Sequence, residues 1–410
     1  MSKLYNLTRM TSATVGSGTL TLGAAVAGFL TFASAGVQDK DIITYSIIDG
    51  VNREIGTGLY TASGTTLTRN VIASTNSNLA LSLSGLAQVA IVEAAEDVLD
   101  VGPSQCRLTY ATGVPVMNSF QATLPVVSTG NVYLTPYVGN YVPIFNGVRW
   151  SMEPLTADLV MTGSDTTTNP PPAVAGGQLY DFFVWMKGSQ LLLTRQPWAT
   201  QFTRSVGLTD INGIDVNAGP ITNGPAQYCG TYVGSAFTGA SANFRWDPLP
   251  AAASGGAPIT VSLWNRYNRV RNVCWCVDNG AAYTYNNQAW RSWRNLTQAY
   301  INFMVGLPID VVEASTWVEL LLGAGAINNI GWCGLGLDTA TATTQSPGAY
   351  KFFQNPSANA MAYSVLARYT GYGNSIGAHS LYAMESGNNV SPAPQFCANS
   401  QSVLMGVITA

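Results

Sequence analysis

The sequence predicts an all-β protein with two or more antiparallel β-sandwich (jelly-roll-like) domains and little helix. Charged residues make up only 10% of the 410 residues, against about 25% in an average soluble chain. Apolar residues make up 47%, which is ordinary. Short stretches of alternating hydrophobicity, separated by Gly, Asn and Ser, recur at intervals of about ten residues, a spacing typical of sandwiches and barrels.

This composition excludes several classes of protein. Helical enzymes coat their solvent-facing stripes with Lys and Glu, and disordered chains combine low hydrophobicity with high net charge. The net charge of −3 provides no overall field for capturing nucleic acid, so we expect no nucleic-acid partner. Abundant small polar and β-branched residues favour sheets that neighbouring chains largely cover.

Residues 1–40 form a Gly/Thr/Ser-rich segment that imitates a signal peptide. Lys3 and Arg9 precede an apolar run that ends in Ala33-Ser34-Ala35. Gly, Thr and Ser interrupt the run, which favours turns and short strands over a lipid-facing helix. We therefore expect no export signal and no membrane span, but an N-terminal arm that becomes ordered only against a partner.

Residues 41–103 are predicted to form an N-terminal β domain. Residues 42–48 alternate, Asp49-Gly50 suits a turn, and residues 78–85 alternate again. The side chains expected to face the core are Ile43, Tyr45, Ile47, Leu79, Leu81 and Leu83. An acidic stretch at 93–100, followed by Gly102-Pro103, indicates a solvated linker and a boundary.

A larger β-sandwich domain is expected over 104–345, followed by a Gly/Asn-rich β segment over 346–410. The strongest strand candidates are 179–186, 191–198, 259–270, 273–277, 281–285, 300–306, 309–315 and 361–369. Asn212-Gly213 predicts a two-residue hairpin turn. Three consecutive prolines within 163–177 predict an exposed loop. No period of 20–50 residues indicates a solenoid or propeller.

The six cysteines are too sparse for a disulfide scaffold and show no C-x-x-C spacing, so buried free thiols are expected. Cys274 and Cys276 flank Trp275. On a strand, both thiols would lie on one face and the indole ring on the other.

Residues suited to catalysis or metal binding are scarce. His379 is the one histidine, and no nucleophile signature, phosphate-binding loop or zinc spacing accompanies it. Asp210, Asn212 and Asp215 resemble part of a calcium loop, but the hairpin already explains them. We predict no catalytic residue, no metal and no cofactor. A pair among the 21 acids that cleaves glycosides stays an open alternative.

Residues 264–294 are the most distinctive stretch, because arginines alternate there with aromatic residues. We call eight of them the Arg/aromatic belt: Trp264, Arg266, Tyr267, Arg269, Trp290, Arg291, Trp293 and Arg294. Such residues are enriched in subunit interfaces and can also stack on sugars or bases. We predict a subunit interface or glycan contact, with a sheet core for Trp and Tyr as the simpler alternative.

Several motifs occur in an order that resembles a module of tailed-bacteriophage virion proteins. They are NVYLTPYVGNYVPIFNGVRW (131–150), LYDFFVWM (179–186), LTDINGIDVNAG (208–219), YCGTYVGS (228–235), LWNRYNRV (263–270), WRSWRN (290–295) and GLGLD (334–338). Residues 51–78, VNREIGTGLYTASGTTLTRNVIASTNSN, resemble a second piece of such proteins.

The resemblance implies a structural virion component, not an enzyme. Proteins of this kind form tail, collar or head fibres, spikes and decoration proteins, and they assemble as homotrimers or larger rings. We therefore expect a homotrimer located in the virion and assembled in the host cytoplasm, with residues 41–103 docking on the particle and other virion proteins as partners. Host surface polysaccharide is a further expected partner. The alternatives are a capsid decoration or cement protein and a glycan-binding or glycan-cleaving adhesin.

Overall fold

A computed structural model describes most of the chain. The described residues are 4–94, 101–117, 127–147, 149–164, 173–249, 258–278, 280–296, 299–323, 327–343, 350–356, 359–372, 375–397 and 402–410. The predicted proline loop and acidic linker lie largely outside these ranges.

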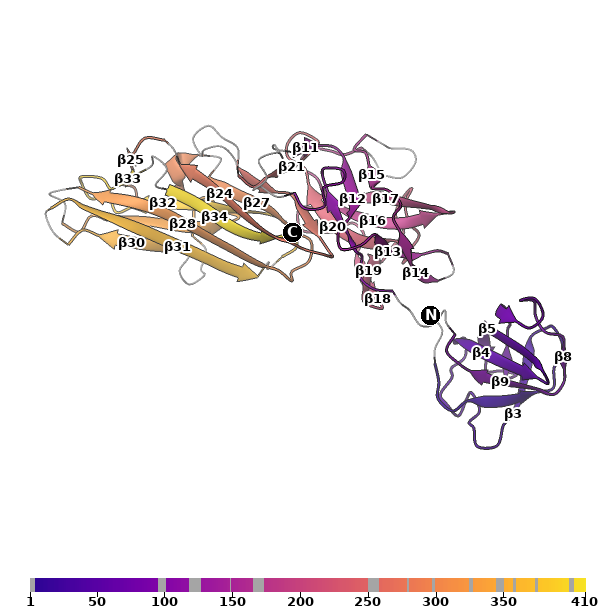
Figure 1. Cartoon of the computed structure of the whole chain (residues 1–410). Coiled ribbons are helices and arrows are strands. Elements are labelled where there is room, and N and C mark those ends of the chain that lie inside the picture. Colours follow the sequence, from indigo (N-terminus) through magenta and orange to yellow (C-terminus); the bar gives the residue numbers. More distant parts are fainter. Residues whose placement is uncertain are drawn as a thin grey trace. The chain divides into compact units, whose positions relative to one another are not determined.

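The chain divides into two compact units, Met1–Asp100 (unit 1) and Val101–Ala410 (unit 2). Both consist of antiparallel strands, apart from one parallel pair in unit 2, so the predicted all-β fold is confirmed (Figure 1). Within the described ranges, the helical structure is a single 3-10 turn, η1 (Trp293–Asn295). The division at Asp100 lies close to the boundary predicted at 103.

Unit 1 is a sheet that closes on itself. Its strands are β1 (Arg9–Ser12), β2 (Val15–Gly16), β3 (Leu20–Ala25), β4 (Ile42–Asp49), β5 (Asn52–Thr61), β6 (Thr66–Leu67), β7 (Asn70–Ser74), β8 (Leu83–Ser84) and β9 (Ala87–Ile91). The order β4-β9-β1-β3-β6-β5 returns to β4 through the β4–β5 hairpin, and β7 pairs with β5. The predicted boundary between residues 40 and 41 falls inside this sheet, because β1 and β3 of the expected arm are two of its strands.

In unit 1, alternate side chains along the strands point into the core, as the sequence predicts. Ile43, Tyr45 and Ile47 are fully buried, and Gly50 adopts a positive φ of 57° in the turn after β4. Leu79 differs from its prediction, since it is 66% exposed. It lies in a turn and not in a strand, so strand alternation does not apply to it.

A buried ion pair stabilises the closed sheet of unit 1. The Glu54 carboxylate accepts hydrogen bonds from Arg69 Nε (2.9 Å), Tyr45 Oη (2.9 Å) and the backbone N–H of Leu81 (2.8 Å). Both side chains of the pair are almost completely buried. Arg69 also donates to the carbonyl of Leu81 at 3.0 Å, which fixes a loop against the strands.

Unit 2 begins with a sheet of six strands and two small sheets. The six-stranded sheet has the order β17 (Gln190–Pro197), β16 (Leu179–Lys187), β20 (Thr231–Phe237), β19 (Ile214–Asn217) and β18 (Leu208–Ile211), with β23 (Leu263–Asn265) also paired to β20. The small sheets are β10 (Cys106–Thr109), β12 (Val132–Pro136) and β15 (Leu159–Met161), and the hairpin β13 (Tyr141–Phe145) and β14 (Trp150–Pro154).

Two further sheets complete unit 2. One has the order β11 (Val127–Thr129), β21 (Phe244–Asp247), β22 (Ile259–Val261), β27 (Tyr300–Val305), β32 (Gly377–Gly387), β29 (Ile330–Leu337) and β30 (Tyr350–Gln354), with β26 (Arg291–Ser292) on β32. The other, here the C-terminal sheet, has the order β24 (Arg271–Asp278), β34 (Ser402–Thr409), β28 (Val311–Leu322), β33 (Gln395–Cys397) and β25 (Tyr283–Thr284), with β31 (Met361–Tyr372) on the other edge of β28.

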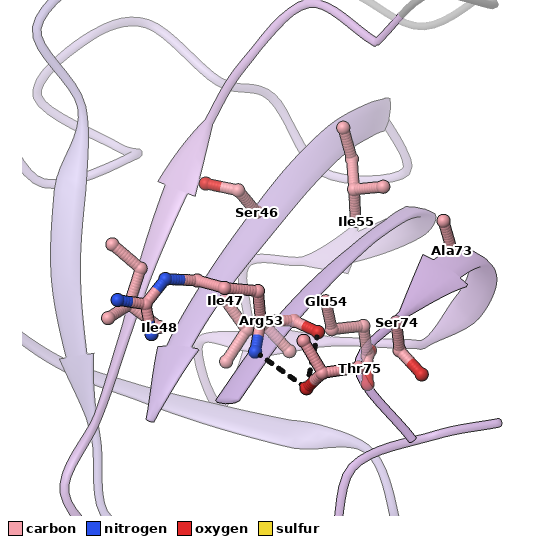
Figure 2. A pocket seen from close by; sticks show the side chains of 9 residues that line it. All are labelled: Ser46, Ile47, Ile48, Arg53, Glu54, Ile55, Ala73, Ser74 and Thr75. Atoms are coloured by element: carbon pink, nitrogen blue, oxygen red, sulfur yellow. Dashed lines mark hydrogen bonds between the residues drawn. The ribbon is translucent and has the colours of Figure 1, made fainter. Parts of the chain in front are cut away.

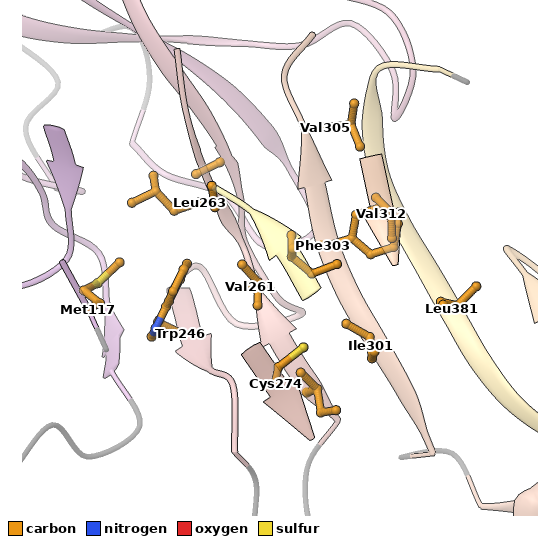
Figure 3. Packing of buried hydrophobic residues seen from close by; sticks show 14 of the residues in the cluster. Met117, Trp246, Val261, Leu263, Cys274, Ile301, Phe303, Val305, Val312 and Leu381 are labelled. Atoms are coloured by element: carbon orange, nitrogen blue, oxygen red, sulfur yellow. The ribbon is translucent and has the colours of Figure 1, made fainter. Parts of the chain in front are cut away.

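These last two sheets pack face to face as a sandwich. Their facing side chains share one hydrophobic core, in which Cys274, Ile301, Phe303 and Leu381 lie together (Figure 3). At Gly406 a side chain would overlap Ile301, so glycine allows the sheets to approach closely at this point. The predicted segment 346–410 is not separate from the larger domain, because β31, β32 and β34 pair within these two sheets.

In unit 2, the predictions that depend only on neighbouring residues are confirmed. The hairpin of β18 and β19 turns at Asn212 and Gly213, which both have positive φ as a type I′ turn requires. Cys274 and Cys276 are buried on one face of β24, while Trp275 is half-buried on the other. The five cysteines whose state is described are free thiols.

We predict that Arg69→Met lowers the free energy of unfolding of unit 1 by about 3–5 kcal/mol, because the Glu54 carboxylate would stay buried without its partner. Amide hydrogen exchange of residues 42–61 in the full chain measures this loss. All ten tryptophans lie in unit 2, so tryptophan fluorescence should report an unchanged transition. The control Arg53→Met, at an exposed position, should change stability by less than about 0.5 kcal/mol. Unchanged exchange in Arg69→Met would contradict the role of the pair.

Candidate functional site

The structure divides the Arg/aromatic belt into two groups, each built around acidic residues distant in the sequence. The first group contains Trp264, Arg266, Tyr267 and Arg269, and the second contains Arg291, Trp293 and Arg294. Trp290 lies beside the second group.

In the first group, Trp264 is the central side chain and is 1% exposed. Its indole N–H donates to Asp310 Oδ2 at 2.9 Å, and Arg269 pairs with the other oxygen of the same carboxylate. The Arg269 guanidinium lies 5.7 Å from the Trp264 ring centre. A side chain at Gly306 would overlap the indole, so glycine makes room for it. The result is a closed contact between β23 and the start of β28.

Arg266 and Tyr267 extend this group toward the hairpin of β18 and β19. Arg266 forms an ion pair with Asp215 of β19 and lies 5.3 Å from the ring centre of Tyr267. Asp215 is one of the residues that resemble a calcium loop, and the structure assigns its carboxylate to this ion pair. Tyr267 is 7% exposed, and burial raises its pKa to about 12.

Two asparagines of the segment 263–270 bind backbone groups in β10 and just before it. The Asn265 side chain accepts from the Leu108 N–H at 2.6 Å and donates to the Leu108 carbonyl at 3.3 Å. Asn268 Nδ2 donates to the carbonyls of Ser104 (2.7 Å) and Cys106 (3.3 Å). The two amides thus replace the hydrogen bonds that another strand would offer.

A buried charge network lies behind Trp264. Arg204 Nε donates to Asp181 Oδ2 at 2.7 Å, Ser235 Oγ donates to the same carboxylate, and Arg204 also donates to the carbonyl of Gly306 at 2.7 Å. The Asp181 side chain is 1% exposed. Sequence reasoning missed this pair, because its two members are 23 residues apart and carry no local signature.

The second group surrounds the buried carboxylate of Glu385 on β32. Arg291 Nε donates to it at 2.7 Å, the backbone N–H of Arg294 at 3.1 Å, and the Tyr283 hydroxyl also donates. Arg294 has a left-handed φ of 50°, unusual for a residue with a side chain, and its N–H bonds Glu385 in this conformation. Burial raises the pKa of Glu385 to about 7, although its hydrogen-bond donors and the charge of Arg291 act in the opposite direction.

Aromatic rings cover the two arginines of the second group. The Arg291 guanidinium lies 3.6 Å from the ring centre of Tyr285, and that of Arg294 lies 4.8 Å from Tyr283. Arg294 also pairs with buried Asp278 at 3.3 Å. The two arginine side chains are still 28% and 23% exposed, close to the 24% and 25% of Arg266 and Arg269, so an external anion or sugar can reach all four arginines of the belt.

The tryptophans of this region differ in exposure. Trp293 is 1% exposed and belongs to the core of unit 2. Trp290 is half-buried, with its ring centre 6.2 Å from that of Tyr350. Trp264, Tyr267 and Trp293 therefore pack inside the chain and have little surface left for another molecule. A subunit or glycan contact stays a prediction for Trp290 and the four arginines.

His379 lies between Asp338 and Ser375, an arrangement that sequence reasoning did not foresee. Its Nδ1 is 2.8 Å from Asp338 Oδ2, and its Nε2 is 3.0 Å from the Ser375 carbonyl and 3.3 Å from the Ser375 hydroxyl. Burial lowers the pKa of His379. The opposite effects are larger, because Asp338 raises this pKa through its hydrogen bond and its charge and the Ser375 carbonyl also raises it, so the net shift is upward. Both ring nitrogens face acceptors, which favours the imidazolium and opposes a role as general base.

Unit 1 carries a shallow depression of about 430 Å³ next to β4, β5 and β7 (Figure 2). Its lining residues are Ser46, Ile47, Ile48, Arg53, Glu54, Ile55, Ala73, Ser74 and Thr75. The Arg53 N–H donates to Thr75 Oγ1 at 3.1 Å, and the Arg53 guanidinium donates to the carbonyl of Gly50 at 2.8 Å. Glu54 binds Arg69. These polar groups already form hydrogen bonds and ion pairs within unit 1, so we assign no ligand to the depression.

In the described ranges, no three His, Cys, Asp or Glu side chains gather as metal ligands. Nor does any helix there have the length and apolarity to cross a membrane.

Comparison with known proteins identifies no family. No family model matches the sequence, and no curated protein matches it. Among solved structures, the chain aligns over its full length with 74% of a chain in the structure of infectious bursal disease virus Gx strain, at 11% identity and a TM-score of 0.23. It also aligns over 98% of its length with 61% of the insecticidal delta-endotoxin Cry8Ea1 from Bacillus thuringiensis, at 8% identity and a TM-score of 0.18.

A third alignment covers 99% of this chain and 74% of a chain in T=1 particles derived from infectious bursal virus, at 11% identity and a TM-score of 0.11. TM-scores of this size do not establish a common fold.

The raised pKa of Glu385 predicts a pH dependence of stability. Between about pH 4.5 and 7 the folded protein keeps a proton that the unfolded chain releases, so the free energy of unfolding falls as pH rises, by roughly 3 kcal/mol in total. Thermal unfolding at pH 5 and 7.5 measures the difference. Glu385→Gln should remove this dependence, and the control Glu313→Gln, at a side chain that is 47% exposed, should keep it. Equal pH slopes in the wild type and Glu385→Gln would contradict the assignment.

Proposed function

We propose that this chain is a non-catalytic structural component of a tailed-phage virion. In this proposal it is a homo-oligomer, a trimer by analogy with the phage proteins it resembles, in a tail, collar or head fibre or spike. Unit 1 docks on the particle, and unit 2 contacts sister subunits and the host surface. The observation that carries the proposal is a strand surface with few charges and with exposed large apolar side chains such as Trp317, Phe352 and Met405. Exposed apolar surface of this kind marks a site where another molecule binds.

The positions of the phage-like motif residues support the proposal. In residues 51–78, Glu54 and Arg69 form the buried ion pair of unit 1. In the segment 263–270, Trp264 and Arg269 share the Asp310 carboxylate. These motif residues hold strands and loops in place, as expected for a framework that many virion proteins could share.

Glycan binding is a second candidate function, and one observation favours it. Arg291 and Arg294 are partly exposed beside the rings of Tyr285 and Tyr283. Cations next to aromatic rings suit an acidic sugar, which would add to attachment without any bond cleavage.

Location on the particle tests the structural proposal. Particles purified from infected cells should contain the chain in many copies, and gold-labelled antibodies against unit 2 should mark fibres or spikes that project from the tail, collar or head in electron micrographs. Labelling spread along the capsid surface, without projecting fibres, would instead indicate a decoration protein. Absence of the chain from purified, infectious particles would contradict a virion role. Binding of the recombinant chain to host polysaccharide on an array, lost in Arg291→Lys with Arg294→Lys, would support the glycan contact.

A further inference from the structure

The outer face of the C-terminal sheet carries a patch of exposed apolar side chains, and no other sheet among the described residues covers it. Along β28, residues of even number are buried against the sandwich core, and those of odd number point outward. The outward side chains include Trp317, which is 46% exposed. On the neighbouring strands, Leu366 of β31 is 39% exposed and Met405 of β34 is 43% exposed.

Strand register joins these residues into a continuous patch. Trp317 lies opposite Leu366 on one side and Val403 on the other, and Val403 lies opposite Val277 of β24. We call these four residues the central row. The next row contains Met405 and Trp275, which are also cross-strand neighbours. Six apolar side chains, two of them indoles, therefore face outward over four strands.

Opposite charges flank the central row at equal distances. Arg368 lies opposite Ser315, two residues from Trp317 on one side, and Glu319 lies two residues from Trp317 on the other side. Each is about 7 Å from the central row along the strands. Neither side chain forms a salt bridge within the described part of the chain.

We propose that this face binds the same face of a second copy of the chain, through a two-fold axis that runs along the central row. This axis exchanges the two flanks, so Arg368 of each copy lies across from Ser364 of the other, one strand away from Glu319. The central rows pack on each other as two stacked sheets do, about 10 Å apart. Arginine and glutamate side chains together can span that gap.

The charge pattern argues for a second copy over an unrelated partner. A two-fold contact must be self-complementary, so each positive group needs a negative group at the mirrored position. Arg368 and Glu319 lie on opposite flanks of adjacent strands and meet this condition to within one strand spacing, so each contact forms two identical ion pairs around an apolar centre. The other charges of this face, Arg271 and Glu313, pair with each other within one copy. Stable interfaces have this composition, with aromatic side chains at the centre and charged side chains at the rim. The inference rests on the proposed assembly role and adds a two-fold contact that joins copies in pairs, which is separate from the three-fold contacts within the proposed trimer.

Charge exchange tests the contact on the full chain. Arg368→Glu and Glu319→Arg should each weaken self-association about tenfold or more, because each places like charges together twice per interface. The double variant Arg368→Glu with Glu319→Arg restores opposite charges and should return the affinity to within about threefold of the wild type. Sedimentation velocity over a concentration series measures all three constants.

Two further variants separate the contact from folding effects. Lys187→Glu makes the same charge change as Arg368→Glu at an exposed hairpin position outside the face, and it should leave association unchanged. Trp317→Ser should weaken association without a loss of strand signal in circular dichroism.

Specific results would overturn the proposal. These are a wild-type chain that stays monomeric at high concentration, single exchanges without effect, or a double variant as weak as the sum of both singles. These results leave the particle-location test untouched, so failure of the contact and failure of the virion role can be told apart.

Discussion

This protein has few charged side chains, and most of them form ion pairs or hydrogen bonds that connect its strands. The rest of the structure depends on these contacts. The acidic side chains of Glu54, Asp181, Asp278 and Glu385 are at most 1% exposed, and each pairs with an arginine. Arginine suits this role because its planar fork of donors satisfies a carboxylate and nearby carbonyls together. In a chain with only 10% charged residues, burying these pairs leaves the sheet exteriors with little charge. Neutral exteriors favour assembly over a freely dispersed state.

The segment LWNRYNRV shows how sequence, packing and proposed function are connected. Its asparagines bind the backbone of β10, its tryptophan and second arginine bind Asp310, and its first arginine binds Asp215. One short segment thus joins β10, β19 and the start of β28. A rigid framework of this kind lets loops and outer sheet faces vary, which suits virion proteins that share a scaffold but meet different partners.

Much of the fold could be predicted from the sequence, because alternation and turn residues act locally. The core positions of Ile43, Tyr45 and Ile47 and the Asn212-Gly213 turn follow from neighbouring residues alone. The arrangement of the Arg/aromatic belt could not be predicted in this way. Arg291 meets Glu385, 94 residues further along the chain, and no local pattern encodes that distance. The same limit explains why residues 346–410 were expected to be separate, although their strands complete sheets begun by distant segments.

The most direct test of the account compares side-chain oxidation in the free chain and in assembled particles. Trp317 and Met405 are exposed in the isolated chain and react readily with hydroxyl radicals, so mass spectrometry can follow both. The account predicts strong labelling of the dilute, monomeric protein and a loss of most of that labelling in the assembly, while exposed Phe202 and Tyr228, outside the outer face, report the general accessibility of unit 2. Equal labelling of Trp317 and Met405 in both states would contradict the claim that assembly covers the neutral sheet exterior.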